Sequence, residues 1–165
     1  MAEFLFTTDA DMKSTTLMGG DLDPDKYKFT ISNAMDSVIE PLLGTELYNV
    51  IAAGAEAANL TGLYLELYND FIKPITKNAG LSGYLKIASI ELNNAGLFKR
   101  QPENSIALED GEIDHISQLY MRKADKDIGR FYKWIGLNPL TEYKTSQDRV
   151  DSQKIEPSSG WYFGE

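Results

Sequence analysis

The chain has 165 residues, of which 42% are hydrophobic and 25% are charged, and its formal net charge is −9. This composition fits one globular domain with a sizeable core. The negative charge argues against the chain as a whole binding bare nucleic acid or an anionic membrane. Because the sequence has no cysteine, disulfides, thiolate chemistry and cysteine-based metal sites are excluded.

No apolar run approaches the roughly 20 residues that a membrane-spanning helix needs. The start, MAEFLFTTDADMK, lacks the basic region and the long apolar region of a signal peptide. We therefore expect no membrane partner and synthesis in the cytoplasm.

Residues 1–23 are predicted to form an N-terminal arm. Phe4, Leu5 and Phe6 make a short apolar cluster, which is followed by a stretch rich in Thr, Asp and Gly. Gly19-Gly20 marks a hinge within this stretch.

The first helix is predicted to begin at Asp23-Pro24, since Asp is a good N-cap and Pro suits the first helical position. One face then carries apolar residues at spacings of four, four, three and four: Tyr27, Ile31, Met35, Val38 and Leu42. Pro41 should bend or end this helix. A short helix is expected over residues 45–53, followed by a small, polar loop over residues 54–59.

A third helix is predicted to start near Leu60 and to meet Pro74; its apolar stripe is Leu60, Leu63, Leu67 and Phe71. Residues 37–42 and 70–75 share the order polar, apolar, Ile, charged, Pro, apolar. This similarity is either a weak internal repeat or two helix ends built alike. A fourth helix is expected over residues 81–95, with Gly96 as its C-terminal cap. The segment from Phe98 to Asp110 breaks the pattern and predicts an extended loop or a short hairpin.

The last helix has the clearest pattern and is predicted over residues 111–135. Its apolar residues keep helical spacing throughout: Ile113, Ile116, Tyr120, Ala124, Ile128, Phe131 and Ile135. Gly136 and Pro139 should end it. Together the elements predict an all-α bundle of four to five helices over residues 24–140, with one long inter-helix loop and extended N- and C-terminal arms.

Catalytic chemistry has little support in the sequence. His115 is the only histidine, and we interpret it as solvated or capping. Neither a GxxxxGK[ST] phosphate loop nor an HExxH motif is present. Asp21-Leu-Asp23-Pro-Asp25 spaces its oxygens as a calcium loop does, but it lacks the sixth-position Gly, and Ser32 stands where a bidentate carboxylate is needed. We predict no catalytic residue, no metal site and no cofactor, and hence not an enzyme.

The last helix also carries a basic stripe, Arg122, Lys126, Arg130 and Lys133, at spacings of four, four and three. One interpretation is a solvated face paired with Asp125 and Asp127. The second is a subunit interface at which the stripe meets an acidic neighbour. The third is contact with passing DNA, against which the net charge weighs.

Residues 141–165 are predicted to form an extended C-terminal arm, because their polar composition cannot offset the entropy of ordering. The arm nevertheless ends in three aromatics: Trp161, Tyr162 and Phe163. Burying such rings stabilises by roughly 1.5–3 kcal/mol each. They are therefore candidate anchors on another copy or on a partner protein, the alternative being a tail that folds back onto its own core.

The layout resembles the head–tail connector (adaptor, or head-completion) proteins of tailed bacteriophages. The resemblance is carried by Ile39-Glu-Pro41-Leu-Leu-Gly44-Thr-Glu-Leu47-Tyr48, by Ile72-Lys-Pro74 and by Asn94-Ala-Gly96-Leu, between an arm and a long final helix with a tail. It looks closest to versions from phages of Bacteroidetes, including crAss-like phages, in which a terminal Gly-Trp-Tyr-Phe is also expected.

The resemblance implies a structural virion protein at the neck, assembled in the host bacterial cytoplasm. Such proteins form a homo-oligomeric ring, usually a dodecamer, below the portal protein. The ring extends the DNA channel, without sequence-specific DNA binding, and supports the next neck or tail protein. On this basis Trp161, Tyr162 and Phe163 would anchor on the portal or an adjacent ring. The alternative is a small acidic intracellular helical binding module, such as a regulator or inhibitor of a nucleic-acid enzyme.

Overall fold

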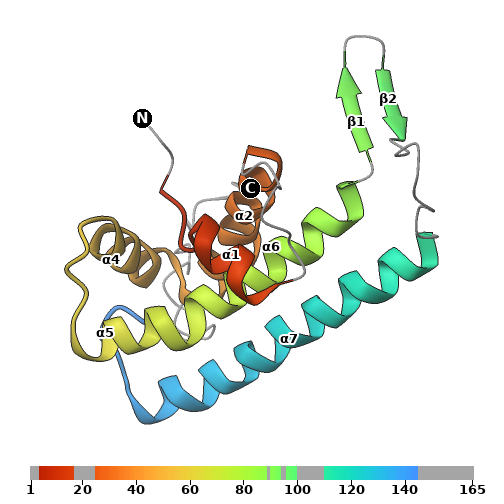
Figure 1. Ribbon diagram of the computed structural model, residues 1–165. Helices are drawn as coiled ribbons and strands as arrows, with labels where there is room; N and C mark the ends of the chain where they lie inside the picture. Colours follow the sequence, from red (N-terminus) through yellow and green to blue (C-terminus); the bar gives the residue numbers. More distant parts are fainter. Residues whose placement is uncertain (1–3, 17–24, 89, 94–95, 100–109, 145–165) are drawn as a thin grey trace, which may run out of the picture.

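The computed structural model describes residues 4–16, 25–88, 90–93, 96–99 and 110–144. The predicted all-α class is confirmed, with one antiparallel hairpin between the two longest helices (Figure 1). The elements in chain order are α1 (Asp9–Thr15), α2 (Asp25–Ala34), the π-helical segment η1 (Met35–Ile39), α3 (Glu40–Leu43), α4 (Thr45–Glu56), α5 (Gly62–Leu67), the π-helical segment η2 (Tyr68–Ile72), α6 (Lys73–Ile87), β1 (Ile90–Asn93), β2 (Gly96–Lys99) and α7 (Asp110–Leu137).

A proline follows each of the two π-helical segments, with one residue between the end of the segment and the proline. Pro41 and Pro74 each occupy the second position of the helix that follows, α3 and α6. In both places the residue before the proline donates its N–H to the carbonyl five residues back, at Met35 and at Tyr68. A wider turn of this kind accommodates a residue that lacks an N–H and whose ring crowds the preceding turn of an α-helix. The similarity between residues 37–42 and 70–75 is therefore also a similarity of local structure.

The predicted third and fourth helices are one continuous helical rod. Ile72 and Lys73 both have right-handed helical dihedrals, so α5, η2 and α6 follow each other without a break across Pro74. The prediction of a fourth helix over residues 81–95 is wrong beyond Ile87, because the chain turns there into the hairpin. β1 pairs with β2 in the register Ile90 to Lys99 and Asn93 to Gly96, so the hairpin lies earlier than the predicted loop. Residues 100–109 lie outside the described part of the chain.

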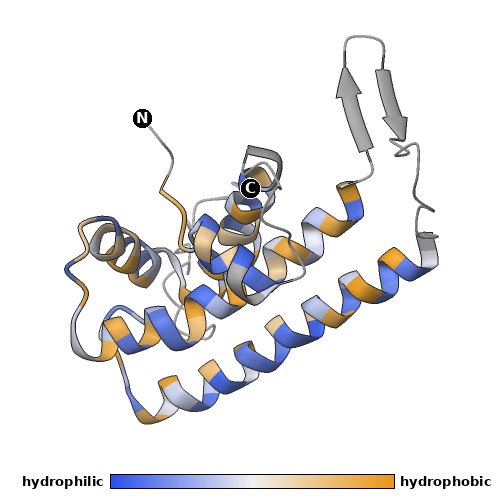
Figure 2. Cartoon of the chain, viewed as in Figure 1, coloured by the Kyte–Doolittle hydropathy of each residue, from blue (hydrophilic) through white to orange (hydrophobic). Residues whose placement is uncertain are grey.

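The core lies between α2, the α5–α6 rod and α7. The predicted inward residues of α7 are confirmed at Tyr120, Ala124, Phe131 and Ile135, all of which are buried. Ser117 of α7 is also buried and bonds to Ser82 of α6, with 3.0 Å between the hydroxyl oxygens. Figure 2 shows hydrophobic and hydrophilic residues alternating turn by turn along α7, as expected of a helix packed on one face.

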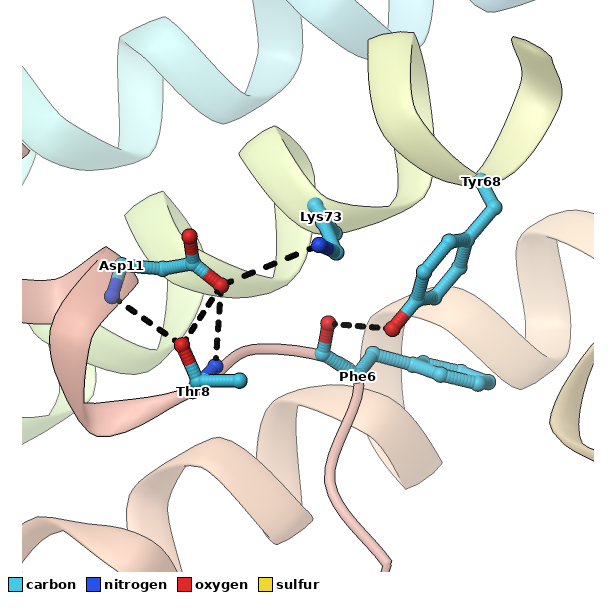
Figure 3. A network of polar contacts seen from close by, with 5 residues as sticks. All are labelled: Phe6, Thr8, Asp11, Tyr68 and Lys73. Atoms are coloured by element: carbon cyan, nitrogen blue, oxygen red, sulfur yellow. Dashed lines mark hydrogen bonds and ion pairs between the residues drawn. The ribbon is translucent and has the colours of Figure 1, made fainter. Parts of the chain in front are cut away.

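The N-terminal segment lies on the helical domain, so the predicted arm over residues 1–23 is wrong for residues 4–16. Phe6 and Met12 are fully buried. The Phe6 ring meets the rings of Tyr48 and Tyr68 edge to face. The backbone carbonyl of Phe6 accepts a hydrogen bond from the Tyr68 hydroxyl at 3.0 Å (Figure 3). The apolar cluster of the predicted arm, Phe4, Leu5 and Phe6, therefore packs into the core.

A capping box holds α1 in place beside this contact. The Thr8 hydroxyl accepts the Asp11 N–H at 3.1 Å, and the Asp11 carboxylate accepts the Thr8 N–H at 3.2 Å (Figure 3). Lys73 lies 3.8 Å from the same carboxylate. Burial raises the pKa of Asp11, but the Thr8 hydrogen bonds and the charges of Lys73 and Lys77 outweigh it and lower that pKa overall.

The chain after α7 folds back onto the domain as far as the structure describes it. Leu140 is buried, and the Tyr143 ring lies 5.7 Å from that of Phe131. The Tyr64 hydroxyl donates to Glu142 at 2.9 Å, a bond that raises the pKa of Tyr64. The helical domain thus continues at least to Lys144, four residues past its predicted end at residue 140.

Candidate interaction surface on the last helix

The four predicted basic residues of α7 lie on one exposed face, opposite the side that packs on α6. Arg122, Lys126, Arg130 and Lys133 are all exposed. At about 100° per residue they fall within a quarter of the helix circumference, roughly opposite Phe131 and Ala124. Exposed residues extend the same line in both directions at spacings of three and four: His115, Leu119 and Leu137. We call these seven residues, from His115 to Leu137, the α7 stripe.

Among the described residues, Arg130 is the one cation of the α7 stripe with a partner in the same subunit. Arg130 forms an ion pair with Asp127 at 2.9 Å and lies over the Phe71 ring at 5.5 Å. In the part of the chain that the structure describes, Arg122, Lys126 and Lys133 make no ion pair. Of the predicted pairing with Asp125 and Asp127, the described residues show only the Arg130–Asp127 pair, while the other three cations are exposed without an ion pair.

Two further residues of this surface were missed in the sequence. Lys123 lies beside the stripe with its ammonium group 4.5 Å from the centre of the Tyr120 ring. Leu119 is 43% exposed although it is a large aliphatic residue. The signal available in the sequence was that Leu119 does not fall on the helical spacing of the inward-facing residues of α7.

A surface hollow of about 440 Å³ lies beside Leu119. Its described lining is Ile116, Leu119, Tyr120, Arg122, Lys123 and Lys126. Three of these side chains are cationic and the other three are hydrophobic. The surface is therefore suited to a partner that offers carboxylates around an apolar side chain.

Charge is segregated along the chain between the α7 stripe and the segment that runs from η1 through α4 and α5 to η2. Residues 115–137 contain five Lys and Arg residues and two Asp residues. Residues 36–70, which run from η1 to η2, contain no Lys or Arg and six acids: Asp36, Glu40, Glu46, Glu56, Glu66 and Asp70. In Figure 1, α4 and α7 lie on opposite sides of the rod. One subunit therefore presents a cationic helix and an acidic helix in different directions.

The predicted C-terminal anchor, Trp161, Tyr162 and Phe163, lies outside the described residues and remains a prediction. His115 is exposed, in line with the interpretation of a solvated side chain. Within the described ranges, no helix is long and apolar enough to cross a membrane.

The fold and this surface define a small all-α protein whose last helix carries an exposed cationic stripe. The chain belongs to the family described as "Family of unknown function (DUF6712)", whose model matches residues 39–152, more than half of the sequence. No curated protein and no solved structure matches the chain. The matched range contains both prolines after the π-helical segments and the whole α7 stripe. The terminal aromatics lie outside it.

Proposed function

We propose that the chain is a structural protein of a tailed-bacteriophage virion. In this proposal its copies form a ring below the portal, which joins the head to the tail and extends the DNA channel. The ring is proposed to hold twelve subunits and to reside at the neck of the virion. The chain acts on no substrate in this role.

The observation that carries the proposal is the α7 stripe on a chain of net charge −9. Three of its cations have no ion pair among the described residues, and two of its leucines, Leu119 and Leu137, are 43% and 83% exposed. A monomer gains nothing from leaving these side chains in water, whereas a contact between copies would cover them. The acidic remainder would then repel the phosphates of DNA passing through the ring.

The terminal aromatics have a second role in the proposal. Trp161, Tyr162 and Phe163 would anchor the subunit on the portal protein or on the next neck or tail protein. Their removal should leave the ring intact and abolish attachment to that partner, because the stripe and the anchor are different parts of the chain.

Negative-stain electron microscopy of the purified chain at high concentration tests the proposal. We expect closed rings of uniform diameter with an open centre wide enough for a DNA duplex. Compact particles without a central opening would contradict it and would favour the small acidic binding module. Added duplex DNA should not shift the particles in a gel, since no DNA recognition is proposed.

A further inference from the structure

The outer face of α4 is opposite in charge to the α7 stripe and, like it, carries an exposed aliphatic side chain. Leu47 and Ile51 face the core, while Glu46, Val50 and Glu56 lie on the exposed side of this helix. Val50 is 40% exposed, close to the 43% of Leu119. Each surface is thus one helix face with an exposed aliphatic side chain among charges of a single sign.

The spacing of the charges is also similar. Glu46 and Glu56 are separated by about 15 Å along the axis of α4, and Arg122 and Lys133 by about 16 Å along the axis of α7, at 1.5 Å per residue. Among the described residues Glu56 has no ion pair, and Glu46 is paired with Lys144 at 2.5 Å. Two carboxylates on one helix can therefore face two or three cations on the other.

We propose that the α7 stripe of one copy docks on the outer face of α4 of a second copy. The contact is head to tail, because the two surfaces are different patches on one subunit. A repeated contact of this kind leaves an unused α4 and an unused α7 at the ends of every short assembly. It builds a closed ring if the rotation between neighbours closes and a filament if it does not. Only the closure of these contacts into a ring rests on the proposed function. The contact between α7 and α4 is argued from the two surfaces themselves.

Other occupants fit the observations less well. The α7 stripe of another copy would bring like charges together in a two-fold contact, which is unfavourable. DNA phosphates would suit the cations but would leave Leu119 and Leu137 uncovered, and the negative charge of the chain opposes such a complex. The outer face of α4 offers both charge and an apolar side chain.

A pair of charge-reversed variants tests the docking. The α7 variant is Arg122→Glu/Lys126→Glu, and the α4 variant is Glu46→Lys/Glu56→Lys. Each should self-associate at least tenfold more weakly than the unchanged chain in sedimentation velocity. An equimolar mixture should recover association, because the unchanged α4 of the first variant can meet the unchanged α7 of the second. The two reversed surfaces also carry opposite charges, so they do not repel each other in the mixture.

A matched control separates local from overall charge. Lys28→Glu/Lys86→Glu changes the net charge by the same amount as the α7 variant, at exposed positions on α2 and α6. This variant should associate as the unchanged chain does. Failure of the mixture to pair, or equal weakening by the control, would overturn the proposed docking.

Cross-linking gives a second measurement that retains every charge. Because the chain has no cysteine, Ala53→Cys on the outer face of α4 and Gly129→Cys beside the α7 stripe introduce unique thiols. Mixed under mild oxidation, the two variants should form disulfide-linked heterodimers in large excess over homodimers. Homodimers alone, or no cross-link, would contradict the docking.

The two proposals fail in different ways. Rings that persist in both charge-reversed variants would preserve the proposed function and overturn the docking. If the two variants associate in the mixture but the unchanged chain forms only open filaments, the docking would stand and the connector function would be overturned.

Discussion

Gly80 of α6 lies against Ile31 of α2, where the two helices pack closely. A Cβ atom at position 80 would be 3.2 Å from Ile31 Cγ1 and 3.3 Å from Ile31 Cα. The second of these atoms belongs to the backbone, so α2 itself would have to shift. The absence of a side chain at position 80 therefore allows α2 and α6 to pack this closely.

For this reason Gly80→Ala should lower the free energy of unfolding by about 1–3 kcal/mol, the usual effect of overpacking. Gly129→Ala is the matched control, because a Cβ there would meet nothing within 4 Å. It should stabilise α7 by up to about 1 kcal/mol, since Ala has the higher helix propensity. Urea denaturation followed by circular dichroism measures both, and equal stability of the two variants would contradict this account of the packing.

At the scale of elements, the N-terminal segment departs most from its sequence pattern. Phe6 is fully buried between Tyr48 and Tyr68, and its N–H lies 3.4 Å from the Met35 sulfur. Met35 begins η1 and Tyr68 begins η2. The segment therefore joins the two π-helical segments, which are distant in the sequence.

Phe6→Ala should lower the free energy of unfolding by about 3–5 kcal/mol, as expected for removal of a fully buried ring. Phe29→Ala, at a position that is 66% exposed, should change it by no more than about 0.5 kcal/mol. Thermal or chemical denaturation distinguishes the two. Equal effects would show that residues 4–16 contribute little to the core.

The contrast between α7 and the other elements shows what the sequence could predict. In α7 the inward residues recur over many turns, so its limits and its buried face follow from periodicity alone. The basic stripe follows from the same spacing. The continuation of the helix through Pro74 could not be predicted from the sequence, because proline normally ends a helix and the π-helical turn before it has no recognised sequence pattern.

The burial of Phe6 and the role of Leu119 required tertiary structure. A short apolar cluster followed by a polar stretch has the same composition whether it extends from the domain or folds back onto it. Only the contacts of Phe6 with Tyr48 and Tyr68 distinguish the two arrangements. Likewise, the exposure of Leu119 can be recognised only once α7 is known to pack on the rest of the domain through its opposite face.

At the scale of the whole molecule, the segregation of charge is the property that connects fold and proposed function. The α7 stripe and the outer face of α4 point in different directions, and each leaves an aliphatic side chain exposed, Leu119 and Val50. A chain of net charge −9 would otherwise repel its own copies. Local complementarity between two helix faces is what allows such chains to associate.

Native mass spectrometry of the purified chain, across concentration and across ionic strength, tests the central claim that these subunits build a closed ring. We expect one dominant oligomer, with twelve copies, that dissociates as salt screens the contact between the stripe and α4. Intermediate species should be few, because only closure satisfies every subunit. A discrete homodimer, or a monomer at every concentration, would contradict the claim.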